Sequence, residues 1–269
     1  MSTPSSSNLE YKAKKAETPF ETFLRYTNEK AVSAAVLADI LKDHLTEGAS
    51  MLDIGAGNGE YLGLALQRIP ARHQIDVTLV EPSQDLLKPL SRRFAGLLPD
   101  SHVEILNTDL QNFASDKKFD LILMAHLFYH IAQPARPKQL QKAIGLLKPG
   151  GTLIIVLREQ DDIADYKNAF KPLLFDKEFK ALVLDDVLTA LPDPDKLHID
   201  RHIVDATLRI PINENMEDTI AIIEFLLNKP WIDIPQDIQL SALQFIRDKE
   251  ACFSLRDGVA VITKRHAEE

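Results

Sequence analysis

The chain has 269 residues, of which 45% are hydrophobic and 26% charged, and these ordinary globular proportions exclude wholesale disorder. Its formal net charge of −9 disfavours nucleic acid as the main partner, because a negative surface repels a phosphate backbone. The single cysteine, Cys252, excludes an internal disulfide and a thiolate metal cluster, and it favours a reducing cytoplasmic setting.

The amino-terminal stretch MSTPSSSNLEYKAKKAE is polar and has no apolar core like that of a secretory signal. Its serine, proline and lysine content predicts a flexible tail over residues 1–18. No segment reaches the ~20 apolar residues that a membrane-spanning helix needs. We therefore expect no membrane partner.

Apolar spacing predicts alternating helices and strands after this tail. In chain order they are helices over 19–27 and 29–45, a strand over 51–55, a helix over 61–69, a strand over 76–80, a helix over 84–97 with Ser83 as N-cap, strands over 102–106 and 119–125, a helix over 138–147 and a strand over 152–157. The strands read VTLV, LILM and LIIV, continuous apolar runs that are typical of a parallel sheet covered by helices on both faces.

From residue 161 onward the pattern becomes mainly helical. We expect helices within 161–190, a strand over 202–210, helices over 216–228 and 236–249, and two short strands over 252–255 and 258–264 joined by an Arg-Asp-Gly turn. The economical architecture is one doubly wound α/β domain over residues 19–269. Its core covers about 48–158, and a helical cap comes from 19–47 and 159–250.

A glycine-rich loop follows the first predicted strand and contains, in order, Asp53, Gly55, Gly57, Gly59 and Glu60. Glycines let the backbone turn sharply and approach a ligand closely. A dinucleotide loop needs G-x-G-x-x-G, whereas here the third glycine comes one residue early and an acid stands in its place. Two carboxylates would repel a pyrophosphate, so the loop favours a cationic or zwitterionic ligand and disfavours a nicotinamide-dependent oxidoreductase.

Two further acids follow predicted strands. Glu81 ends the second strand in LVEPS, where its carboxylate can accept hydrogen bonds from both hydroxyls of a ribose. Asp109 follows the third strand in LNTDL, where it can accept a hydrogen bond from an adenine amino group. An ordinary loop aspartate is the alternative for Asp109.

The order D-x-G-x-G-x-G, an acid ending strand two, an aspartate after strand three and LLKPGGTL before strand five resembles the class I S-adenosylmethionine-dependent methyltransferases over roughly residues 50–157. The resemblance implies a Rossmann-like, seven-stranded, mostly parallel sheet with an antiparallel last strand, and S-adenosyl-L-methionine as cofactor. It implies the following cofactor contacts: the methionine part along Gly55, Gly57 and Gly59 after Asp53, the ribose at Glu81 and Pro82, the adenine at Asp109 and Leu110, and the sulfonium near Ala125 and His126.

The flanks resemble histamine N-methyltransferase more narrowly. FETFLRYTNEK before the loop is similar to that family's F-x-x-F-L-x-x-S-T-E-H, so Glu29 matches the glutamate that contacts the substrate amine. LFYHI after strand four is similar to its L-Y-Y-V segment, with His126 where the family has a glutamine. The family's tryptophans after strand five have no counterpart here, which points away from histamine and toward another small amine.

In-line displacement from a sulfonium needs an aligned, neutral acceptor, so a group that takes or relays the acceptor's proton helps. His126, Tyr129 and His130 are the candidates, with Glu29 orienting the substrate. The alternatives are structural roles for the two histidines and the tyrosine, and an exposed helix-start acid for Glu29. The i,i+4 spacing of the histidines could suggest a metal, but no third ligand is evident and we expect no metal.

The sequence thus predicts methyl transfer to a small-molecule acceptor, with an amine nitrogen as the methyl-accepting atom. The alternatives are an O-methyltransferase, a protein side-chain methyltransferase and a non-catalytic S-adenosylmethionine-binding regulatory module. We expect neither nucleic acid nor membrane as partner, and a monomer or weak homodimer.

Overall fold

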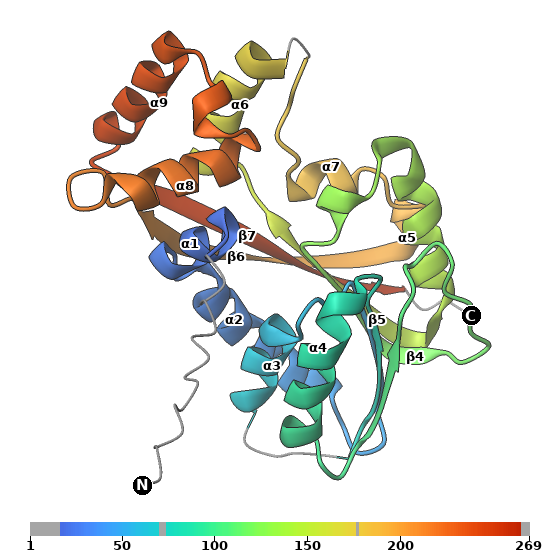
Figure 1. The fold of residues 1–269 in the computed structure, drawn as a ribbon. Helices are drawn as coiled ribbons and strands as arrows, with labels where there is room; N and C mark the ends of the chain where they lie inside the picture. The colour runs from blue at the N-terminus through green and yellow to red at the C-terminus, as the bar shows by residue number, and fades with distance from the viewer. Residues whose placement is uncertain (1–16, 70–73, 176–177, 265–269) are drawn as a thin grey trace, which may run out of the picture.

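The computed structural model describes residues 17–69, 74–175 and 178–264 (Figure 1). Of the tail predicted over residues 1–18, all but Glu17 and Thr18 lie outside the described residues. Thr18 caps the first helix, because its hydroxyl accepts a hydrogen bond from the Glu21 N–H. No helix within the described ranges is long and apolar enough to cross a bilayer.

A single seven-stranded sheet organises the molecule (Figure 1). Its strands are β1 (Ser50–Ile54), β2 (Asp76–Val80), β3 (His102–Leu106), β4 (Phe119–Ala125), β5 (Leu147–Arg158), β6 (Leu197–Arg209) and β7 (Cys252–Lys264). They lie in the order β3-β2-β1-β4-β5-β7-β6; β7 pairs antiparallel with β5 and β6, and the other pairs are parallel. The predicted fold class, a mostly parallel sheet with an antiparallel last strand, is confirmed.

Helices cover both faces of this sheet, as its continuous apolar strands require. In the described residues they are α1 (Pro19–Tyr26), α2 (Glu29–His44), α3 (Glu60–Gln67), α4 (Gln84–Leu97), α5 (Arg136–Gly145), α6 (Asp162–Phe175), α7 (Leu184–Leu188), α8 (Met216–Leu227) and α9 (Gln236–Asp248). The helices α2, α3 and α4 pack on the face of β1 that carries Met51, and α5 and α7 pack on the face that carries Leu52. Successive side chains of one buried strand therefore enter two different cores.

The antiparallel pair of β6 and β7 extends past the parallel strands and carries a helical cap (Figure 1). There α1, from the amino-terminal end, joins α6, α8 and α9 around a third core. Tyr166, Phe170, Phe245 and Phe253 form an aromatic group within it, with ring centroids 4.9–5.9 Å apart. Segments from both ends of the chain thus contribute to the cap.

The predicted turn at Arg256-Asp257-Gly258 is wrong. Cys252–Lys264 is one unbroken strand, because β6 pairs with it along its whole length and β5 pairs with Asp257–Thr263 on the other edge. Gly258 is needed for close packing instead of a turn: a Cβ there would lie 2.1 Å from a carboxylate oxygen of Glu159. Pairing on both edges has overridden the local Asp-Gly turn signal.

Smaller differences concern element ends. The strand predicted from residue 152 begins at Leu147, and the strand predicted from 202 begins at Leu197. Ser83 occupies the N-cap position of α4, but its side chain makes no capping hydrogen bond. Its backbone N–H donates to Glu81 instead, which ties this turn to the end of β2.

Candidate functional site

The predicted site residues gather at the edge of the sheet where the parallel strands end. β1 leads into the glycine loop, β2 into Glu81 and β4 into His126, while β5 ends at Arg158. Carboxyl ends of neighbouring parallel strands form the usual ligand crevice of an open α/β sheet. The strand order therefore places the loop and the acids side by side.

All three glycines of the loop have left-handed backbone conformations, with φ of 76° at Gly55, 59° at Gly57 and 74° at Gly59. The Gly55 N–H donates to the carbonyl of Val80 at 2.8 Å, which anchors the loop to β2. A Cβ on Gly57 would meet no atom within 4 Å, so this peptide borders open space. The loop can therefore bring bare backbone against a ligand.

Two buried carboxylates stand beside this open backbone. One oxygen of Glu81 accepts the Gly57 N–H at 2.8 Å, and the other accepts the Ser83 N–H at 2.7 Å. Asp53 is 4% exposed, and burial, followed by repulsion from Glu81, raises its pKa to about 7. Two carboxylates thus lie next to the loop, and their negative charge favours a positively charged ligand over a diphosphate.

The other residues predicted to contact a cofactor lie close by in different environments. Asp109 is exposed, and one of its oxygens accepts hydrogen bonds from the Asn112 backbone at 2.8 Å and side chain at 3.0 Å. Its local role is therefore a turn cap. Leu110 is buried in the sheet core, Pro82 is exposed, and Ala125 is half-buried at the end of β4.

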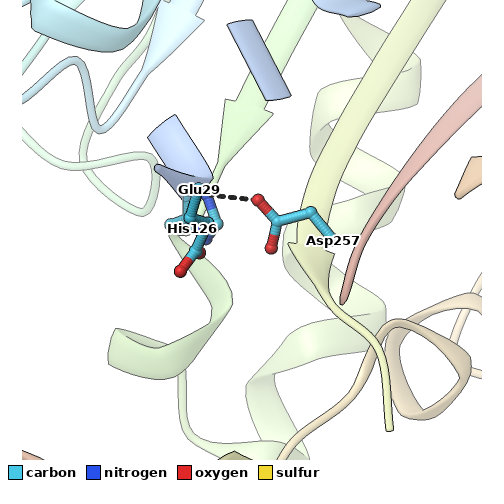
Figure 2. A group of neighbouring side chains, drawn as sticks. All are labelled: Glu29, His126 and Asp257. Carbon is cyan, nitrogen blue, oxygen red and sulfur yellow. Dashed lines mark ion pairs between the residues drawn. The ribbon is translucent and has the colours of Figure 1, made fainter. Parts of the chain in front are cut away.

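Glu29, His126 and Asp257 form a compact group on the other side of the crevice (Figure 2). They come from the start of α2, the end of β4 and the middle of β7, and their ligand-type atoms lie within 4.8 Å of one another. No third ligand beside the two histidines is evident from the sequence. Asp257 supplies one, and it was missed because the predicted turn removed it from the strand.

Glu29 is a buried member of an ion network, and the exposed helix-start alternative is wrong. Its carboxylate accepts a hydrogen bond from Arg158 at 2.6 Å, and the other arm of that guanidinium bonds Asp161 at 2.7 Å. Burial opposes ionisation of Glu29, but the positive charge of Arg158, helped by His126, outweighs it and lowers the pKa of Glu29.

His126 has a strained backbone, with φ of 51°, which is uncommon for a residue other than glycine. Its ring lies edge-on to Tyr61 with centroids 5.9 Å apart, and parallel to Tyr129 at 6.4 Å. Its Nε2 is 3.6 Å from an oxygen of Asp257, while a third of the side chain remains exposed. Such strain persists where the surroundings hold a side chain in place, and it clusters at functional sites.

The other two predicted proton-relay candidates separate in space. The hydroxyl of Tyr129 accepts the backbone N–H of Arg158 at 3.4 Å, so its tip points toward the ion network. His130 ends the short 3-10 turn η1 (Phe128–His130), is exposed, and is not a member of the group of Figure 2. The spacing of His126 and His130 therefore does not form a shared site.

Comparison with known proteins points to one family. Residues 52–153 match the family model described as a methyltransferase domain. The trans-aconitate 2-methyltransferase of Rhodopseudomonas palustris (strain BisB18) is 27% identical over 143 residues, which are 53% of this chain and 50% of that protein. The matched part thus spans about half the length of this curated relative.

Solved structures share the fold at low identity. The YcgJ protein of Bacillus subtilis is 15% identical with a TM-score of 0.57, over 87% of this chain and 99% of that one. The N-methyltransferase NodS of Bradyrhizobium japonicum WM9, solved with S-adenosyl-L-homocysteine, is 13% identical with a TM-score of 0.51, over 93% and 90%. Residues 52–153, which carry the glycine loop and the first four strands of the sheet, therefore match a methyltransferase domain.

Proposed function

We propose that this protein transfers the methyl group of S-adenosyl-L-methionine to a small-molecule acceptor, and that the acceptor atom is an amine nitrogen. The observation that carries the proposal is the pair of buried carboxylates, Glu29 and Asp257, beside His126 at the end of β4. A group of acids favours a basic ligand, and a nearby imidazole can take or relay a proton.

Two features of the glycine-loop region support the proposed binding of S-adenosyl-L-methionine. Open space beside Gly57 leaves room for the methionine part, and Asp53 lies behind it. Glu81 retains lone pairs for the ribose hydroxyls beyond its two backbone contacts. The remaining assignments are carried over from the sequence: Gly55 and Gly59 with the methionine part, Pro82 with the ribose, Asp109 and Leu110 with the adenine, and Ala125 near the sulfonium.

When bound, the cofactor supplies an electrophilic methyl group on its sulfonium. The protein's part is to align the acceptor at about 3 Å in line with the breaking bond and to exclude water. Glu29, held by Arg158, would orient the acceptor, and His126, Tyr129 or His130 would receive its proton. His126 is the best placed of the three, since it alone lies in the group of Figure 2.

Replacing Glu81 by alanine should weaken binding of S-adenosylhomocysteine by about ten- to a hundredfold, or about 1.4–2.8 kcal/mol. The change removes both the expected ribose contact and the acceptor of the Gly57 N–H. Isothermal titration calorimetry measures the affinity, and Glu104→Ala, on exposed β3, is the matched control. An unchanged affinity in Glu81→Ala would mean that the crevice lies elsewhere.

Replacing Glu29 by glutamine should raise the KM for an amine about tenfold and leave the affinity for S-adenosylhomocysteine unchanged. The reason is loss of a charged hydrogen bond to the acceptor, worth roughly 1.5–3 kcal/mol. Steady-state kinetics with the best amine measure the effect. A fall in thermal stability with an unchanged KM would assign Glu29 to structure alone.

O-methylation is the second candidate, favoured by the name of the trans-aconitate 2-methyltransferase relative. An anionic acceptor would need a free cation near His126, and Arg158 is already bonded to Glu29 and Asp161. The negative charge of the acids beside His126 therefore supports an amine as the methyl acceptor. The finer resemblance to histamine N-methyltransferase has no support from the matches described above and stays a prediction.

Methyl transfer to a panel of small amines, matched in size with carboxylic acids that include trans-aconitate, tests the proposal. Mass spectrometry of the products should find an N-methyl product. An O-methyl product would favour the second candidate, and labelled protein would indicate side-chain methylation. Binding of S-adenosylhomocysteine without transfer to any acceptor would indicate a regulatory module. Cytoplasmic location and a monomeric or weakly dimeric state stay predictions from the sequence.

A further inference from the structure

Asp257 is a buried carboxylate that lacks the hydrogen bonds such groups usually have. It lies in the middle of β7, paired in register with Arg158 of β5 and Val204 of β6. The residue is 1% exposed, and neither carboxylate oxygen has a hydrogen-bond partner among the described residues. Nearly all buried polar groups in proteins are hydrogen-bonded, so an exception at a candidate site needs a reason.

Charged and titratable groups from five elements face Asp257. They are Glu29 of α2, Tyr61 of α3, His126 after β4, Tyr129 of η1 and Arg158 of β5. The hydroxyl of Ser33 on α2 also lies near it, bonded to Tyr61 at 2.8 Å. Of these groups, the imidazole of His126 is the one at ion-pair distance, with Nε2 3.6 Å from Oδ2 (Figure 2).

A structural ion pair does not explain the position of Asp257. The guanidinium of Arg158 is its neighbour across the strands, yet both arms are directed to Glu29 and Asp161. A divalent metal is also disfavoured, since the same guanidinium contacts Glu29 at 2.6 Å and would repel a second cation. Other polar neighbours of Asp257 include the Ser33 hydroxyl and the Glu29 carboxyl, and neither carries a positive charge. The imidazole of His126 is the partner at ion-pair distance that can carry one.

We infer that Asp257 is a positioning residue: it fixes the His126 imidazole and stabilises the positive charge that forms when this imidazole takes a proton from the acceptor. The inference rests on the proposed function. A third of the His126 side chain is exposed, whereas the Asp257 carboxylate is 1% exposed. Asp257 therefore acts through His126 and does not touch the acceptor.

The step balances without any further reagent. The acceptor ammonium gives one proton to His126, whose new positive charge is paired with the Asp257 carboxylate. The nitrogen lone pair then attacks the methyl carbon, and the electrons of the breaking carbon–sulfur bond stay on sulfur. The products are a methylated ammonium and neutral S-adenosylhomocysteine, and the proton on the imidazole is released to solvent.

The ionisation of Asp257 agrees with this role. Burial raises its pKa to about 6, with repulsion by Glu29 adding to the effect and the positive charges of His126 and Arg158 opposing it. A carboxyl whose pKa is raised by folding favours the protonated state. The free energy of unfolding therefore decreases as the pH rises from about 4 to 6. Above pH 6 the destabilisation by the ionised carboxylate is complete.

Asp257→Asn tests the inference, because activity and stability should change in opposite directions. We expect kcat for the best amine at pH 8 to fall by at least tenfold, and the affinity for S-adenosylhomocysteine to stay within twofold. In the wild type kcat should fall as the pH drops below about 6, where Asp257 becomes protonated. This fall should be smaller in Asp257→Asn, which has no carboxyl to titrate. The melting temperature should rise at pH 8 and stay unchanged at pH 4, since the variant removes a destabilising buried charge.

Asp205→Asn is the matched control. This acid lies on β6, is exposed and pairs with Arg256, so its loss should change neither kcat nor its pH profile. A second, activity-independent measurement follows the Asp257 carboxyl carbon by NMR: its titration midpoint should rise in His126→Gln, because a positive charge that favours ionisation is gone.

The outcomes separate the inference from the proposed function. In one outcome no amine is methylated, but the carboxyl titration responds to His126→Gln and Asp257→Asn stabilises the fold. The interaction of Asp257 with His126 is then supported, and the assigned acceptor is wrong. If amines are methylated while Asp257→Asn leaves kcat intact, or lowers the melting temperature at pH 8, the pair is wrong. Activity that chelation abolishes and Mn²⁺ or Zn²⁺ restores, in wild type but not in Asp257→Asn, would also overturn it in favour of a metal.

Discussion

Replacing Arg158 by methionine should lower the free energy of unfolding by about 3–5 kcal/mol at pH 7. The guanidinium is one-tenth exposed and bonds two carboxylates that are themselves buried, Glu29 and Asp161. Without it, two negative charges remain in a poorly solvated space, next to the carboxylate of Asp257. Methionine fills most of the volume of the arginine side chain. The loss of stability therefore measures the missing positive charge and not a cavity.

Urea unfolding without ligand measures this loss, and Arg256→Met is the control. Arg256 is more than half exposed and pairs with Asp205, so its loss should change stability by at most about 1 kcal/mol. Because folding lowers the pKa of Glu29, the contribution of its ion pair is full above pH 4.5 and fades as the pH falls through the lower folded value. A loss for Arg158→Met that equals the control, or that persists undiminished at pH 3, would contradict a buried ion network.

Replacing Gly59 by alanine should lower the free energy of unfolding by about 2–4 kcal/mol, from left-handed backbone strain and from overpacking. At φ of 74° an L-residue is strained, and the new Cβ would lie 2.6 Å from the Phe94 ring and 2.7 Å from Leu90. Both neighbours are fully buried in the core between α4 and the sheet. The start of α3 would have to move, and the loop with it.

Gly57→Ala separates strain from packing. This glycine is also left-handed, with φ of 59°, but nothing lies within 4 Å of its Cβ position. It should therefore lose only about 1–2 kcal/mol of stability. Its methyl group would enter the space assigned to the cofactor, so binding of S-adenosylhomocysteine should weaken more than its stability falls. Equal stability losses in the two variants, measured by urea unfolding, would show that the core contact of Gly59 does not matter.

The arrangement around the glycine loop could be predicted because its information is local. The glycine loop, Glu81 and Asp109 each follow a strand within a few residues, and the strands themselves are continuous apolar runs. Sequence spacing alone thus placed these residues at one edge of a parallel sheet. The sheet order and the left-handed glycines agree with that prediction.

The group around His126 could not be predicted in the same way, because its residues are far apart in the chain. Glu29, His126 and Asp257 meet only when α2, β4 and β7 are assembled. The Asp-Gly pair at 257–258 reads as a turn locally, whereas pairing with both β5 and β6 keeps it in a strand. The ionic role of Arg158 likewise depends on neighbours 129 positions away and 3 positions away at once.

The sequence by itself determined the class of fold, the glycine loop and the acids next to it, because hydrophobic period and glycine spacing act over a few residues. Only the tertiary structure decided which acids lie beside His126 and which of them Arg158 neutralises. The physical reason is that burial and strand pairing, which set the charge state of Asp257 and the partners of Glu29, are properties of the assembled sheet and have no local signal in the chain.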